Sequence, residues 1–148
     1  MFEVASILLN LNLSTIPSSS VPNIDKPSYI AHQVHTTQDV GATIHIDPND
    51  RPVVGEKSRV WISLTKRGGT IIPYEKCNCR MEVRSLTDKS IKFTVSQSSS
   101  ILDRYLSFPS MEVIFPQVGR YELRLIGSPK VEEDFQPFEL TFTTDVSK

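Results

Sequence analysis

The sequence predicts an all-β fold, an antiparallel sandwich of about seven to eight short strands. From residue 29 onward, apolar and polar residues alternate along most of the chain, which is the pattern of strands with one buried face. Clusters of Gly, Pro, Asn and Asp separate these runs, as turns require. One short segment, 100–107, is the only helix candidate. At 148 residues, the chain is long enough for one domain with a core of its own.

The first two strands are expected at 40–47 and 57–65, on either side of a loop rich in Pro and Asp. Every second residue of each run is apolar, and these residues should face the core. They are Val40, Ala42, Ile44, Ile46, Val60, Ile62 and Leu64. Gly68 and Gly69 follow, and they should form a tight reversal because glycine readily takes positive φ.

The later strands show the same period. They are expected at 77–84, 91–97, 110–115, 119–127 and 137–146. The sequence Gly119-Arg-Tyr121 at the start of one of them resembles the tyrosine corner of immunoglobulin-like sandwiches, in which the phenol bonds to nearby backbone. An ordinary aromatic residue in a strand is the alternative. The sandwich is therefore predicted to be immunoglobulin-like.

The N-terminal part of the chain differs from the rest. Residues 4–24 contain no charged side chain, and their apolar part is too short to cross a bilayer. We interpret residues 1–20 as a signal-like or membrane-docking segment, 21–28 as a linker and 29–148 as the sandwich. Export to an extracytoplasmic compartment, the periplasm or the thylakoid lumen, is the resulting expectation.

Composition and motifs narrow the function. A formal net charge of −1 argues against a dedicated nucleic-acid binder, although residues 51–92 are locally basic, with ten Lys or Arg against four Asp or Glu. The chain contains no nucleophile elbow, phosphate-binding glycine loop or HExxH motif. A protein without enzymatic activity is therefore predicted.

Cys77 and Cys79 are the only cysteines, and they lie in a predicted strand. In an extended strand, residues i and i+2 lie about 6.6 Å apart, too far for their Cβ atoms to reach the roughly 3.8 Å of a disulfide. Regular β structure therefore predicts two reduced thiols on one face, with Cys77 the more exposed. A metal site for Cu or Zn, a disulfide after a turn, and simple packing remain open. His32 or His35 could complete a metal site.

Two blocks, "DVGATIHIDPNDRPVVGEKSRVWISLTKRGGTIIPYEKCNCRMEV" and "FPQVGRYELRLIGSP" followed by "FQPFELTF", carry a resemblance. They resemble a group of small exported cyanobacterial proteins, similar in outline to the immunoglobulin-like domains of periplasmic copper-resistance carriers. The resemblance implies an exported sandwich with no established catalytic role. Those carriers bind metal through His and Met near the N-terminus, but this chain lacks a His-x-His pair or a Met-rich loop.

The first functional hypothesis is an interaction or accessory subunit of a membrane-associated complex, such as a photosynthetic one, with no cofactor. Its protein partner would bind exposed arginines that alternate with core positions. These are Arg80, Arg84, Arg120 and Arg124. The alternative is a metal carrier, for copper or zinc, whose ligands would come from Cys77, Cys79, His32 and His35.

Overall fold

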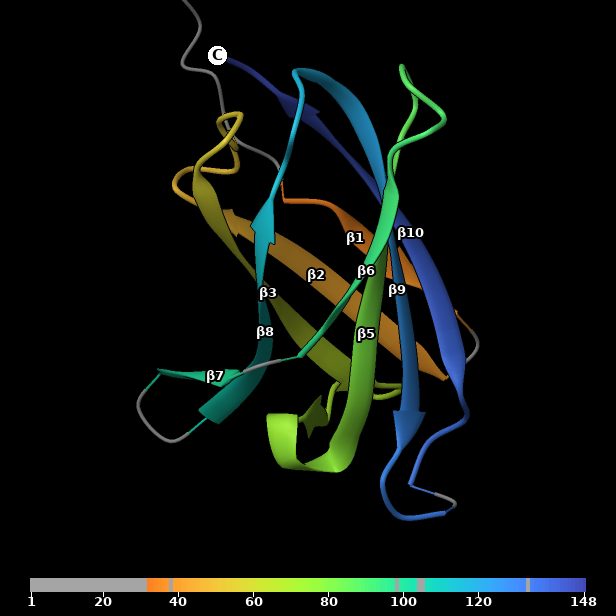
Figure 1. Ribbon diagram of the computed structural model, residues 1–148. Coiled ribbons are helices and arrows are strands. Elements are labelled where there is room, and N and C mark those ends of the chain that lie inside the picture. Colours follow the sequence, from red (N-terminus) through yellow and green to blue (C-terminus); the bar gives the residue numbers. More distant parts are fainter. Residues whose placement is uncertain (1–31, 38, 98, 104–105, 133) are drawn as a thin grey trace, which may run out of the picture.

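A computed structural model describes residues 32–37, 39–97, 99–103, 106–132 and 134–148. In this part of the chain, ten strands and one short 3₁₀ turn follow one another (Figure 1). They are β1 (Val34–Thr36), β2 (Val40–Asp47), β3 (Lys57–Lys66), β4 (Ile71–Ile72), η1 (Tyr74–Lys76), β5 (Cys77–Ser85), β6 (Lys92–Ser96), β7 (Ser99–Asp103), β8 (Leu106–Ile114), β9 (Gly119–Pro129) and β10 (Phe138–Val146).

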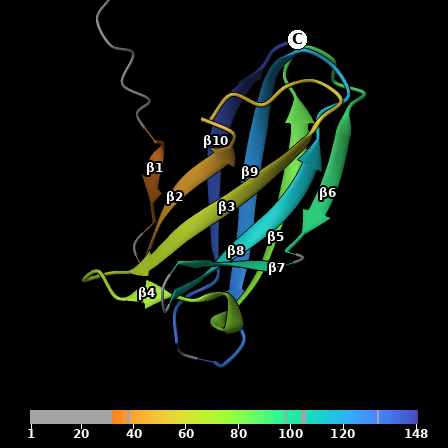
Figure 2. The same cartoon turned by 90° about the vertical axis from the view of Figure 1, so that its left-hand side faces the viewer.

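The strands form two antiparallel sheets packed face to face (Figure 2). One sheet has the order β1-β2-β3-β8-β7, with β4 added beside β3, and the other has the order β10-β9-β5-β6. The two sheets meet at one end, where Val53 pairs with Ser147 in an isolated parallel bridge. The predicted all-β antiparallel sandwich is confirmed, and no described helix is long and apolar enough to span a bilayer.

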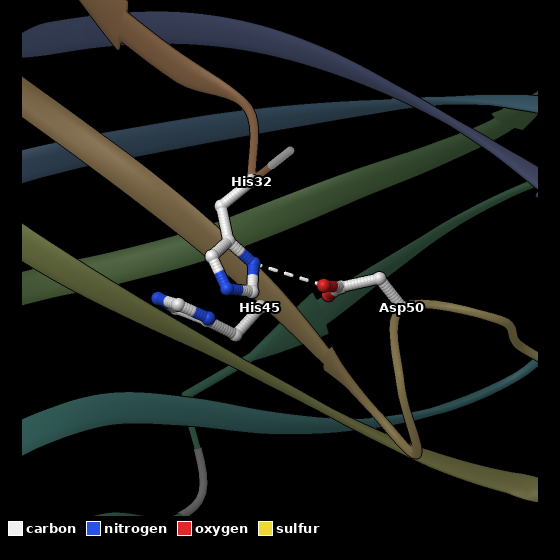
Figure 3. Close-up of side chains that lie close together, drawn as sticks. All are labelled: His32, His45 and Asp50. Carbon is white, nitrogen blue, oxygen red and sulfur yellow. Dashed lines mark ion pairs between the residues drawn. The ribbon is translucent and has the colours of Figure 1, made fainter. Parts of the chain in front are cut away.

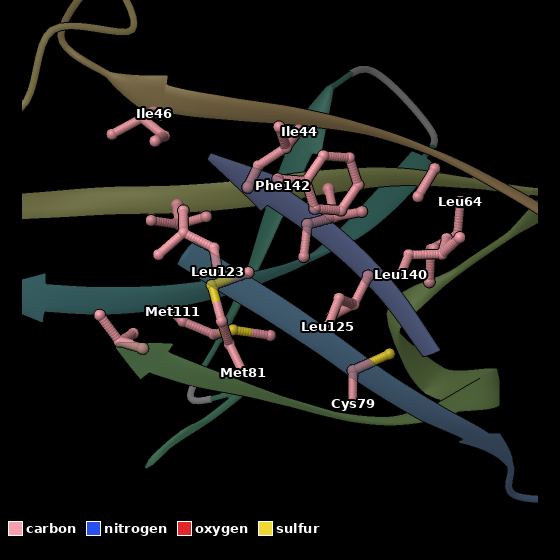
Figure 4. Packing of buried hydrophobic residues seen from close by; sticks show 14 of the residues in the cluster. Ile44, Ile46, Leu64, Cys79, Met81, Met111, Leu123, Leu125, Leu140 and Phe142 are labelled. Carbon is pink, nitrogen blue, oxygen red and sulfur yellow. The ribbon is translucent and has the colours of Figure 1, made fainter. Parts of the chain in front are cut away.

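The core lies between the sheets and is built from the alternating apolar positions (Figure 4). All seven inward residues expected in β2 and β3 are buried. The other sheet contributes the matching parity of β5, β9 and β10, with Met81, Leu123 and Phe142 almost fully buried. Because successive side chains of a strand point to opposite faces, the residues between these positions form the outer faces of the sandwich.

Two predicted turn features are present. Gly68 and Gly69 both have φ values near 95°, in the region that glycine reaches without a steric penalty, and they close the β3–β4 hairpin. The hydroxyl of Tyr121 donates to the carbonyl of Gln117 at 2.8 Å and accepts from its N–H at 3.3 Å. The buried phenol thus bonds to backbone four residues upstream, as expected of a tyrosine corner.

Two expectations need correction. The helix candidate 100–107 instead contributes to β7 and the start of β8, which pair through Ile101 with Phe108 and Leu102 with Ser107. Pairing with a long neighbouring strand satisfies this backbone better than a helix of two turns, which is unstable alone. The short strands β1, β4 and β7 raise the strand count above seven to eight. The predicted segments 1–20 and 21–28 lie outside the described residues.

Candidate metal site

A cluster of donor side chains, His32, His45 and Asp50, lies on the outer face of the six-stranded sheet. His45 follows the buried Ile44 in β2, so the strand's alternation turns it away from the core. Its partner across the β2–β3 ladder is Trp61. The two rings stack with centroids 3.8 Å apart and an interplanar angle of 9°.

Asp50 reaches the same place from the turn after β2. The N–H of Asp50 donates to the carbonyl of Ile46 at 2.7 Å, and the N–H of Ile46 donates back to Asp50 Oδ1, also at 2.7 Å. Asn49 and Asp50 both have positive φ, a conformation that short polar residues tolerate better than most. The turn thus fixes one carboxylate oxygen on the backbone and leaves Oδ2 directed at the cluster.

His32 approaches from the other side, just before β1. Its Nδ1 lies 2.9 Å from Asp50 Oδ2 (Figure 3), and its ring centroid lies 4.1 Å from that of His45. The next residue, Gln33, accepts from the N–H of Thr143 at 3.1 Å and donates to its carbonyl. The arm that carries His32 is therefore tied to β10 of the opposite sheet.

These three side chains are grouped closely enough that they could hold a metal ion. One donor atom from each of His32, His45 and Asp50 lies within 4.8 Å of the others. Ligand bonds of about 2.0 to 2.2 Å, as zinc makes with His and Asp, separate two ligands on one ion by about 3 to 4 Å. The distance of 2.9 Å between His32 Nδ1 and Asp50 Oδ2 is that of a hydrogen bond, so these two atoms pair with each other when no metal is bound.

The protonation state of His45 also suits a ligand. Partial burial lowers the pKa of His45 below its usual value, and the neighbouring His32 lowers it further, whereas Asp50 and Asp47 act in the opposite direction. The depressed pKa favours the neutral imidazole, which is the form that binds metal. His32 is about half exposed and Asp50 less so, so solvent and small ligands can reach the cluster from the His32 side.

The structure separates the predicted histidine ligands. His32 joins the cluster, but His35 lies in β1 with its ring 4.8 Å from that of Phe142 in β10. His35 is not among the grouped donors of the described residues. His45 and Asp50 were not predicted as ligands. The alternation of apolar and polar residues in the sequence shows that His45 faces outward from its strand. It does not show that Asp50 approaches His32 and His45, because that approach depends on the conformation of the turn after β2.

Cys77 and Cys79 form a disulfide, with Cα atoms 5.6 Å apart, although both lie in β5. The expectation of reduced thiols is wrong because it assumed an ideal strand. These are the first residues after η1, and Pro129 opposite Cys77 has no N–H for the ladder, so the backbone there can contract. Cys77 is also the more buried of the two. In this structure the pair offers no thiolate to a metal.

The four predicted arginines lie on the outer face of the four-stranded sheet, and three of them form ion pairs. Arg84 bonds Glu122 at 2.8 Å, Arg120 bonds Asp145 at 2.9 Å, and Arg124 bonds both Glu82 and Glu139. Arg80 is exposed and has no ion pair with another described residue. Binding of a partner by this face stays a prediction.

Comparison with known proteins identifies the fold but no family. No family of known proteins matches the chain, and no curated protein matches its sequence. The solved structures with a similar fold include a DUF4426 family protein of Pseudomonas aeruginosa, at 8% identity and a TM-score of 0.53, covering 78% of this chain and 96% of that one.

FetP of uropathogenic Escherichia coli strain F11 is also similar. The protein as isolated, expressed in the periplasm, matches at 11% identity and a TM-score of 0.56, over 79% of this chain and 94% of that one. A copper-bound single-residue variant matches at 10% identity and a TM-score of 0.57, over 78% and 94%. At these identities the likeness establishes a shared fold and nothing finer.

Proposed function

We propose that this protein binds a transition-metal ion, Cu(II) or Zn(II), through His32, His45 and Asp50, and acts outside the cytoplasm as a metal-binding carrier without enzymatic activity. The observation that carries the proposal is the convergence of three donor atoms within 4.8 Å. Two imidazoles and a carboxylate favour Cu(II) or Zn(II) over Cu(I), which prefers sulfur ligands. Three protein ligands leave a coordination position for water or an incoming ligand.

Two further observations support the compartment and the metal. Disulfides form and persist in oxidising compartments, and the bond between Cys77 and Cys79 is in keeping with export to the periplasm or a similar space. A protein of similar fold has been expressed in the periplasm and a variant of it is copper-bound. Metal binding at the histidine cluster fits both observations.

The test is calorimetric titration of the purified protein with Cu(II) and with Zn(II) in the presence of a competing chelator. We expect one ion of either metal to bind per chain. The double variant Cys77→Ser/Cys79→Ser should bind equally well, because its sulfurs are not ligands. Absence of binding by the wild type would overturn the proposal, and loss of binding in the double variant would move the site to the cysteines.

An accessory role in a membrane-associated complex is a second proposal, supported by the exposed Arg80 and its lack of an ion pair among the described residues. An acidic segment of a protein partner would bind there. Pull-down of such a partner should weaken in Arg80→Gln, and unchanged pull-down would remove this surface assignment. Glu56→Gln, at another exposed position, serves as the control.

A further inference from the structure

Trp61 is the only tryptophan in the chain, and its indole lies flat against a proposed metal ligand. The ring of His45 is 3.8 Å from it and nearly parallel. Trp61 is itself held in place, because its ring centroid lies 5.6 Å from that of the buried Phe108 in the neighbouring strand β8. A row of aromatic contacts therefore runs across three strands and ends at the metal cluster.

We propose that Trp61 is a positioning residue of the metal site, which fixes the ring of His45 and strengthens its bond to a divalent ion. This inference rests on the proposed metal-binding function. Its first part is steric: the χ2 torsion of histidine is broad and has no sharp minimum, so an unsupported imidazole on a sheet face samples many directions. The indole lies against one face of the His45 imidazole and blocks rotation of the imidazole about χ2. One edge of the imidazole therefore stays directed toward His32 and Asp50.

The second part is electrostatic. An imidazole bound to a divalent cation carries more positive charge than the free neutral ring, and the face of an indole attracts positive charge more strongly than the faces of other aromatic side chains do. The stack between His45 and Trp61 is therefore more favourable in the metal-bound state. Such contacts contribute enough to change affinity by about threefold to tenfold.

Packing of the core does not account for this stack. Trp61 is only partly buried and lies outside the core between the sheets, and its ring contacts among the described residues are with His45 and Phe108. Burial in the core would not require the indole of Trp61 to lie parallel to the imidazole of a proposed ligand. The geometry of the stack points to a role in the metal site.

The experiment compares Trp61→Leu, which keeps apolar bulk but removes the aromatic face, with Trp61→Phe, which keeps a smaller one. Each protein is titrated with Cu(II) and Zn(II) against a competing chelator, and the Cu(II) form is examined by electron paramagnetic resonance. We expect Trp61→Leu to lose about threefold to tenfold in affinity for both ions and to show a broader Cu(II) spectrum. Trp61→Phe should recover most of both properties.

The outcomes separate this inference from the function on which it rests. Equal affinities and identical spectra for the wild type and Trp61→Leu would overturn the role of Trp61 alone. Absence of metal binding by the wild type would overturn the proposed function and this inference with it. Circular dichroism and thermal unfolding of the metal-free variants show whether they are folded. If Trp61→Leu does not fold, the comparison between the wild type and Trp61→Phe decides, and equality there also counts against the role.

Discussion

On the outer face of the six-stranded sheet, His45 stacks on Trp61 and lies beside an ion pair between His32 and Asp50. On the outer face of the four-stranded sheet, by contrast, three of the four predicted arginines form ion pairs with carboxylates of neighbouring strands. Arg124 there bonds two carboxylates from the strands on either side. Both faces are polar and both are built by the same alternation, yet among the described residues only the first groups three side chains that could hold a metal ion.

The difference shows what period-two alternation does and does not determine. It decides that a residue faces outward, but whether its charge or donor atom is satisfied depends on the residue opposite it. Glu82 lies opposite Arg124 in the register of β5 and β9, which places unlike charges side by side. His45 lies opposite Trp61, which offers an apolar surface instead of a competing partner.

The largest expected effect is the loss of metal binding in His45→Ala. One of the three proposed ligands disappears, and the two that remain come from separate parts of the chain. Because loss of a residue that merely orients a ligand costs about 10- to 100-fold in affinity, we expect removal of the ligand itself to cost more than about 100-fold. Competition titration with Zn(II) measures it. His35→Ala, on the same sheet but against Phe142, should bind as the wild type does, and equal losses in the two variants would contradict the assigned site.

A smaller effect is expected for Asp50→Asn. The amide can still accept from the N–H of Ile46 and so preserve the turn, but it lacks the negative charge that attracts a cation. We expect affinity to fall by about tenfold or more, in the range seen for groups that tune a ligand set. Asp47→Asn, which changes a neighbouring exposed carboxylate that donates no ligand, should alter affinity much less. A larger effect at Asp47 would mean that the site lies nearer the strand end.

The sequence was sufficient for the sandwich and insufficient for the site. Alternation places Ile44, Leu64 and Met81 in the core, because burial of one sheet face leaves no other choice of register. Alternation alone did not predict the disulfide, since the bond depends on a Cα separation between Cys77 and Cys79 of 5.6 Å, shorter than the about 6.6 Å of a regular strand. The same holds for Asp50, whose approach to His32 is a property of one turn.

The smallest expected effect concerns the paired charges, and it depends on pH. A hydrogen bond from Arg124 lowers the pKa of Glu82 below its usual value. A carboxyl group whose pKa is depressed by folding stabilises the folded state above its unfolded pKa, near 4.5, and that contribution disappears as the pH falls through the lower folded value. Glu82→Gln should therefore be less stable than the wild type at neutral pH, and the two should converge as the pH falls through the lowered folded pKa of Glu82.

Urea unfolding at several pH values measures this difference. It should be small even at neutral pH, because both side chains are partly exposed and Arg124 keeps its bond to Glu139. Glu56→Gln, at an exposed position with no ion pair among the described residues, is the control for the loss of one surface carboxylate. Metal affinity should be the same in all three proteins, since the charges of this sheet stabilise one another and contribute no ligand. A change in metal affinity in Glu82→Gln would show that the two faces are coupled through the core.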